Sequence, residues 1–199
     1  MRFSSRVLFL VLSLIAPAVH AAGDAAAGLA RAVVASRDHG HRPFAVVDKK
    51  TATLSVYRAD GRLVGKSAAL IGAAVGDRSA PGVGTRTQTG RLRPTDRTTA
   101  AGRFVSEPGR NLGGEPVVWI DYDNALAIHR LRPGPTYSQR AQRLASADAR
   151  ERRASAGCVV VPVAFFKAVV EPTLGRGAAV VYVVPEDGDW KRLLDDDDL

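Results

Sequence analysis

Cys158, the only cysteine of the chain, is the residue whose type most directly suggests chemistry. It lies between a turn of small residues and a run of valines, and Gly157 before it permits a tight turn because glycine has no side chain to clash. A free cysteine here has two interpretations. It is either a buried structural residue, since cysteine behaves as a small hydrophobe, or a thiolate nucleophile, which needs a base within reach and an accessible face.

Residues 1–21 bear on this choice. They combine a basic start, an apolar run too short to cross a bilayer and a cleavage site of small residues ending at Ala21, which together predict a secretory signal peptide. An uncleaved membrane anchor is the alternative. We expect export to the periplasm or cell envelope, with no membrane span after cleavage. A lone thiol in an exported protein indicates intermolecular pairing or a reactive group, so export favours chemistry at Cys158.

The chain is basic, with a formal net charge of +8, and loss of Arg2 and Arg6 with the signal peptide leaves +6. This charge favours anionic surfaces such as cell-wall polymer. Nucleic acid is not expected, because the protein is exported and its arginines are scattered. His39 and His41 lack the further ligands that structural metal sites use, so we expect no metal site. No cofactor motif is present either.

The order of apolar runs and turns predicts a mostly β (β-rich α+β) single domain with one or two helices. An Asp60-Gly61 turn indicates a hairpin. Residues 72–102 show little periodicity and are expected to form a long surface connection, which in a compact domain is usually functional or disordered. The strands are expected at residues 44–48, 53–58, 63–71, 116–121, 124–129 and 178–184, with a short one near residue 104, and the helices at residues 139–149 and 164–172.

The expected organisation has four parts. A signal peptide over residues 1–21 precedes an N-terminal extension over residues 22–42, in which residues 29–35 favour a short helix. The folded domain spans residues 43–186, and residues 187–199 form a C-terminal tail that ends in four aspartates and a leucine. Within the domain, His129 ends one expected strand and Cys158 begins a later apolar segment.

Three motifs in this order resemble the catalytic domain of L,D-transpeptidases, the YkuD-type fold that cross-links peptidoglycan through a cysteine acyl-enzyme. The resemblance spans about residues 43–185 and implies a β-sandwich domain of that type. The motifs are Thr99-x-x-Gly102-x-Phe104, Ile128-His129 and Ser155-x-Gly157-Cys158.

The resemblance also implies roles for individual residues. Cys158 would be the nucleophile and His129 the base that deprotonates it, a pairing that makes a thiol more acidic than a free cysteine. The backbone carbonyl of Arg130 would orient the imidazole. Backbone N–H groups near Gly157 and Cys158 would stabilise the oxyanion, and Ser155 belongs to the same catalytic motif.

The sequence departs from the family pattern at several positions. Ala156 stands where the family commonly has histidine, Val160 where it has arginine or asparagine, and Arg130 where it has glycine. Stem peptides end in carboxylates, which guanidinium groups bind through paired donors. We therefore expect Arg130, Arg152 and Arg153, which flank the two motifs, to bind the donor substrate in place of the residue missing at Val160.

The function implied is an L,D-transpeptidase-like acyl transfer on peptidoglycan stem peptides, with release of the terminal D-Ala. Two alternatives stay open. The same thiol would give an L,D-carboxypeptidase or cross-link hydrolase if water were the acceptor. A domain that kept the fold and lost the activity would be a non-catalytic envelope-binding protein. The sequence carries no signal for the oligomeric state.

Overall fold

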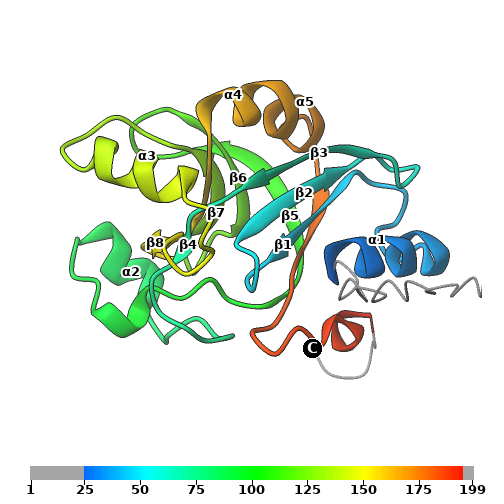
Figure 1. The fold of residues 1–199 in the computed structure, drawn as a ribbon, viewed down its shortest axis with the longest axis horizontal. Coiled ribbons are helices and arrows are strands. Elements are labelled where there is room, and N and C mark those ends of the chain that lie inside the picture. The colour runs from blue at the N-terminus through cyan, green and yellow to red at the C-terminus, as the bar shows by residue number, and fades with distance from the viewer. Residues whose placement is uncertain (1–24, 195–199) are drawn as a thin grey trace, which may run out of the picture.

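Eight strands form one sheet in the order β3-β2-β1-β10-β5-β6-β7-β9 in a computed structural model, which describes residues 25–194. The predicted signal peptide and residues 195–199 of the expected tail lie outside the described residues. A second, two-stranded sheet pairs β4 with β8 (Figure 1). The strands are β1 (Phe44–Asp48), β2 (Thr53–Tyr57), β3 (Leu63–Ala68), β4 (Ile71–Gly72), β5 (Gly102–Arg110), β6 (Pro116–Asp121), β7 (Leu126–Arg130), β8 (Arg153–Ser155), β9 (Val159–Val161) and β10 (Ala179–Val183).

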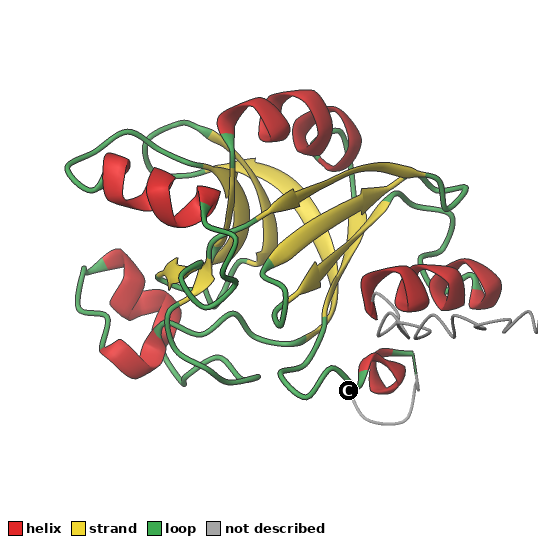
Figure 2. Cartoon of the chain, viewed as in Figure 1, coloured by secondary structure: helices red, strands yellow, loops and turns green. Residues whose placement is uncertain are grey.

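The long strand β5 joins the two halves of the large sheet. Its first five residues pair with β10, and its last four pair with β6. At the other end, Leu70 and Val160 exchange two backbone hydrogen bonds of 2.7 and 2.8 Å, which bring the chain after β3 against β9. The predicted mostly β fold is confirmed, and its two facing halves belong to one curved, nearly closed sheet (Figure 2).

The main core lies between these halves and is made of alternate residues of the strands. Ala45 and Val47 of β1 face inward, whereas Phe44 and Val46 face the opposite side, as expected from the alternation of side chains along a strand. The helical segment 163–174 packs onto the core through Phe166 and Val170. This segment consists of α4 (Val163–Phe165), the π-helical turn η2 (Phe166–Val170) and α5 (Glu171–Leu174).

The outer face of β1 and β10 is covered by α1 (Ala25–Ser36), which buries the stripe Ala26, Leu29, Ala30 and Val33. The 3-10 helix η3 (Trp190–Leu193) lies beside α1, and a Cβ on Gly28 would be 3.3 Å from the Trp190 ring. Part of the expected N-terminal extension and the first part of the expected tail are therefore packed structure. None of the helices in residues 25–194 combines the length and apolarity of a membrane span.

The connection 72–102 is ordered and contains α2 (Val83–Gln88) and the 3-10 turn η1 (Pro94–Asp96). Asp96 is buried and binds both Arg86 of α2, with an Nε–Oδ2 distance of 2.7 Å, and Arg93, with an Nη2–Oδ1 distance of 2.9 Å. The ion pair between Arg86 and Asp96 holds α2 against η1. Together with α1 and α3 (Tyr137–Ala145), α2 makes the helices more numerous than the one or two expected.

Candidate active site

The neighbouring parallel strands β7 and β9 place His129 and Cys158 on the same face of the sheet. His129 is in register with Val160, and Ile128 with Val159, so Cys158 lies one step before β9 beside Ala127. Side chains alternate between faces along a strand. Ala127, His129, Cys158 and Val160 therefore share one face, and all four line the same cleft.

This cleft has a volume of about 460 Å³, within the range of small-ligand sites. The aromatic pair Trp119 and Tyr122, whose rings meet edge to face at 5.0 Å, forms one wall. The loop between β5 and β6 forms another, and Thr87 of α2 and Arg140 of α3 contribute from the helices. The cleft thus gathers β5–β7, β9 and the long connections around the cysteine.

His129 is 8% exposed, and its Nδ1 lies 2.8 Å from the backbone oxygen of Arg130. A carbonyl oxygen only accepts hydrogen bonds, so Nδ1 carries the proton and Nε2 keeps its lone pair. Burial, and next the positive charge of Arg132, lower the pKa of His129 to about 4. The imidazole is therefore neutral at pH 7, in the tautomer that lets Nε2 accept a proton.

Cys158 is half-buried, and its Sγ donates to the backbone oxygen of Ala125 at 3.3 Å. Burial raises the pKa of the Cys158 thiol, opposed by the backbone N–H of Ala127 and by the charge of Arg132. The contacts of the two side chains include no hydrogen bond between Cys158 and His129, which are diagonal neighbours two steps apart in register.

The expectation of an unusually acidic thiol at Cys158 is therefore corrected. Desolvation disfavours the charged form of each group, and the two side chains do not touch closely enough for an ion pair to offset it. Cys158 and His129 form a neutral pair within one cleft.

The turn before Cys158 is held by side chains of both flanking motifs. Ser155 Oγ donates to the backbone oxygen of Cys158 at 2.6 Å and accepts from the N–H of Gly157 at 3.1 Å. Thr99 Oγ1 donates to the backbone oxygen of Gly157 at 2.6 Å and accepts from the N–H of Gly72 at 2.8 Å. Ser155 and Thr99 thus position the backbone that carries the sulfur.

Gly157 has φ of 131°, and a Cβ there would lie 3.0 Å from the backbone oxygen of Thr98. This position therefore favours glycine. The N–H of Gly157 is taken by Ser155, so it is not available to an oxyanion in this arrangement. The backbone N–H of Cys158 interacts with its own sulfur and opposes the rise of the thiol pKa.

A buried lysine, Lys49, supports the turn before Cys158 through Thr99. Lys49 Nζ donates to Asp77 Oδ1 at 2.5 Å, to the backbone oxygen of Gly76 at 2.8 Å and to that of Thr99 at 3.2 Å. The side chain of Lys49 is completely buried. The charge of Lys49 is compensated by Asp77 and, at 3.4 Å, by Glu186. Lys49 thereby fixes Thr99 next to the turn before Cys158.

The three arginines expected to bind substrate do not line the cleft. Arg152 is buried and donates from Nη2 to the backbone oxygen of Thr51 at 2.7 Å, and Arg153 Nη2 lies 2.5 Å from Glu186 Oε2. Arg130 forms an ion pair with Glu115. The alternation of strand side chains explains Arg130, because the residue after His129 points away from its face.

Three other arginines line the cleft, namely Arg110, Arg132 and Arg140. Sequence reasoning missed them because it looked only at the neighbours of the two motifs. Arg110 ends β5, Arg132 follows β7 and Arg140 lies on α3, so only the folded chain brings them together. In residues 25–194, no group of three or more His, Cys, Asp or Glu side chains is placed to hold a metal ion.

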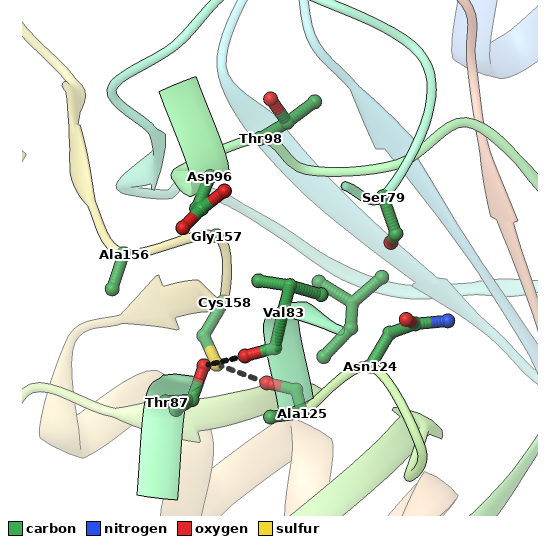
Figure 3. Close-up of a pocket in the computed structure, with 11 residues that line it drawn as sticks. Ser79, Val83, Thr87, Asp96, Thr98, Asn124, Ala125, Ala156, Gly157 and Cys158 are labelled. Carbon is green, nitrogen blue, oxygen red and sulfur yellow. Dashed lines mark hydrogen bonds between the residues drawn. The ribbon is translucent and has the colours of Figure 1, made fainter. Parts of the chain in front are cut away.

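A second cavity, of about 30 Å³, also borders Cys158 and shares Thr87, Ala125 and Ala156 with the cleft. It has room for about one water molecule. Figure 3 shows Val83 and Thr87 of α2 and Asn124 and Ala125 of the turn before β7 around the sulfur. Thr87 Oγ1 is tied to the backbone oxygen of Val83 at 2.9 Å. Cys158 thus lines both the large cleft and the small cavity.

No family model and no curated protein matches this sequence. Among solved structures, the chain is similar to the helical cell shape determining protein Pgp2 from Campylobacter jejuni, with 15% identity and a TM-score of 0.47 over 72% of this chain and 48% of that one. It is also similar to a variant of the Enterococcus faecium L,D-transpeptidase, with 19% identity, a TM-score of 0.41 and coverage of 71% and 49%. It is similar as well to an L,D-transpeptidase from Mycobacterium smegmatis, with 15% identity and a TM-score of 0.40 over 71% of this chain and 58% of that one.

The chain therefore spans about half the length of Pgp2 and of the Enterococcus faecium L,D-transpeptidase. They include L,D-transpeptidases, the family whose motifs the sequence resembles.

Proposed function

We propose that the protein is an exported cysteine acyltransferase of the L,D-transpeptidase type that acts on peptidoglycan stem peptides. The observation that carries this proposal is the arrangement of Cys158 and His129. The sole thiol opens onto a cleft in which an imidazole on the neighbouring strand has its Nδ1 fixed by a backbone carbonyl and its Nε2 free to accept a proton. Triads of nucleophile, base and orienting group follow this logic.

In the proposed reaction, Sγ of Cys158 attacks the carbonyl carbon of the amide before the terminal D-Ala, and the thiol proton passes to Nε2 of His129. The tetrahedral oxyanion accepts a hydrogen bond from the backbone N–H of Cys158. Its collapse breaks the C–N bond, and the amine of D-Ala leaves with the proton from His129. An acceptor amine then attacks the thioester, and His129 takes the proton of that amine. The thiolate leaves and receives this proton from His129, which restores the neutral thiol and imidazole.

The test is incubation of the folded protein with a tetrapeptide donor, followed by intact mass spectrometry and assay of released D-Ala. We expect an acyl-enzyme on Cys158 and its loss in Cys158→Ala. We expect His129→Gln to lower the acylation rate by about 10²- to 10⁴-fold, the usual contribution of a general base. An amine acceptor that raises turnover identifies transfer, whereas turnover that is indifferent to amines identifies hydrolysis.

The non-catalytic envelope-binding domain is the second candidate, and one observation favours it. Burial keeps the thiol of Cys158 protonated, and no hydrogen bond joins it to His129. A protein that binds the tetrapeptide but forms no acyl-enzyme and releases no D-Ala over hours would establish this function instead.

A further inference from the structure

The cleft beside Cys158 carries arginines and no carboxylate. Arg110, Arg132 and Arg140 line it, whereas none of its lining residues is Asp or Glu. A cleft lined by one sign of charge raises the local concentration of ligands of the other sign. The cleft is therefore suited to an anionic group close to the thiol.

Arg132 and Arg140 lie together beside the proposed base. Arg140 Nη2 donates to the backbone oxygen of Arg132 at 2.8 Å. The charges of both arginines act on His129, and that of Arg132 also acts on Cys158. The Nε atom of Arg140 is buried without a hydrogen-bond partner. Glu115 Oε2 lies 3.2 Å from Arg132 Nε and partly neutralises the charge of Arg132. Arg140, by contrast, takes part in none of the ion pairs found in residues 25–194.

The apolar residue at Val160 helps to place Arg140. Val160 packs with Leu70, Leu131 and Leu144 in a small buried cluster, and Leu144 is the buried residue of α3. This contact anchors α3 beside β9 and so brings Arg140, one turn earlier on the helix, to the cleft. Val160, which stands where the L,D-transpeptidase pattern has a polar residue, thus anchors α3, the helix that carries Arg140.

We propose that Arg132 and Arg140 form a carboxylate-binding site that holds a free carboxylate of the donor peptide next to Cys158. This inference rests on the proposed function and names the side chains that select its substrate. Guanidinium groups present paired donors that match the two oxygens of a carboxylate. Arg132 and Arg140 both line the cleft, and no Asp or Glu lines it with them.

The first test compares two alkylating agents of nearly equal size, anionic iodoacetate and neutral iodoacetamide, at Cys158 and pH 7. The measured quantity is the ratio of their rates, from which the thiolate fraction cancels. We expect a ratio about tenfold above that of free cysteine, falling at least about threefold in Arg132→Gln and in Arg140→Gln. Lysine at either position should keep part of the effect. Arg143→Gln, an exposed arginine on the same helix, is the matched control and should leave the ratio unchanged.

The second test does not require a reactive thiol. Cys158→Ala protein is titrated in a calorimeter with an acetylated tetrapeptide stem whose terminal carboxylate is free or amidated. We expect the free acid to bind about tenfold or more tightly than the amide, and Arg140→Gln to abolish this preference while circular dichroism shows the fold intact.

An unchanged rate ratio in the Arg132→Gln, Arg140→Gln double variant, or equal binding of acid and amide, would overturn the inference. If neither reagent alkylates the folded protein, the proposed thiol chemistry fails, and the binding experiment alone decides the role of the two arginines. If the thiol forms an acyl-enzyme but the acid and amide bind equally, the function stands and the carboxylate site does not.

Discussion

Burial of neutral His129 predicts an acid-sensitive fold. The pKa of His129 is about 4 in the folded protein, compared with about 6.5 for a histidine in an unfolded chain. Between these two values the unfolded state holds a proton that the folded state lacks, so stability falls as the pH is lowered. The contribution is complete above about pH 6.5 and is lost below about pH 4.

The magnitude follows from the same two values. They differ by about 2.5, and each pKa unit corresponds to 1.36 kcal/mol, so protonation of His129 removes about 3 kcal/mol of unfolding free energy between pH 7 and pH 4. Because a domain of this size is stable by only about 5 to 15 kcal/mol in all, this loss is large enough to measure.

The assay is urea unfolding of the wild-type protein and of His129→Gln at pH 7 and at pH 4. The other ionisable groups are common to both proteins, so the difference between their pH dependences isolates His129. We expect the wild type to lose about 3 kcal/mol more than the variant. The control His41→Gln changes an exposed histidine and should behave as the wild type does. Equal pH dependences in wild type and His129→Gln would refute the reasoning.

Two further predictions concern the turn that carries Cys158. Thr99→Val should cost about 2 to 5 kcal/mol in urea unfolding, because it leaves the backbone oxygen of Gly157 and the N–H of Gly72 buried without partners; a cost below about 1 kcal/mol would show that the hydroxyl does not hold the turn. Gly157→Ala should destabilise the fold by about 1 to 3 kcal/mol and slow iodoacetamide labelling of Cys158, because its φ is 131° and a Cβ would lie 3.0 Å from Thr98 O; wild-type stability with wild-type labelling would contradict this.

The strands were predictable because their sequences are locally consistent with their structure. β-branched runs form β1, β2 and β10, and the Asp60-Gly61 turn connects β2 to β3. The helix α2 was not predictable, since glycine and the β-branched residues of Val83–Gln88 have low helix propensity. Its position depends on the ion pair between Arg86 and Asp96, a tertiary contact that no local pattern reveals.

At the site, motif order suggested His129 and Cys158 together, and the register of β7 with β9 places them on one face. The pKa of the Cys158 thiol could not be predicted from the motifs, because burial shifts the pKa values of both Cys158 and His129 and the motifs do not indicate burial. The direction of Arg130 was readable from strand alternation. The position of Arg140 in the cleft could not be predicted from the sequence, because it depends on the packing of α3 onto Val160.

The most direct test of the central claim, that Cys158 is an acylating nucleophile, is intact mass spectrometry of the folded protein after incubation with a carbapenem. The account predicts one covalent adduct per chain, mapped to the peptide that contains Cys158 and missing in Cys158→Ala. No adduct after prolonged incubation, in protein whose thiol is still alkylated by iodoacetamide, would contradict it.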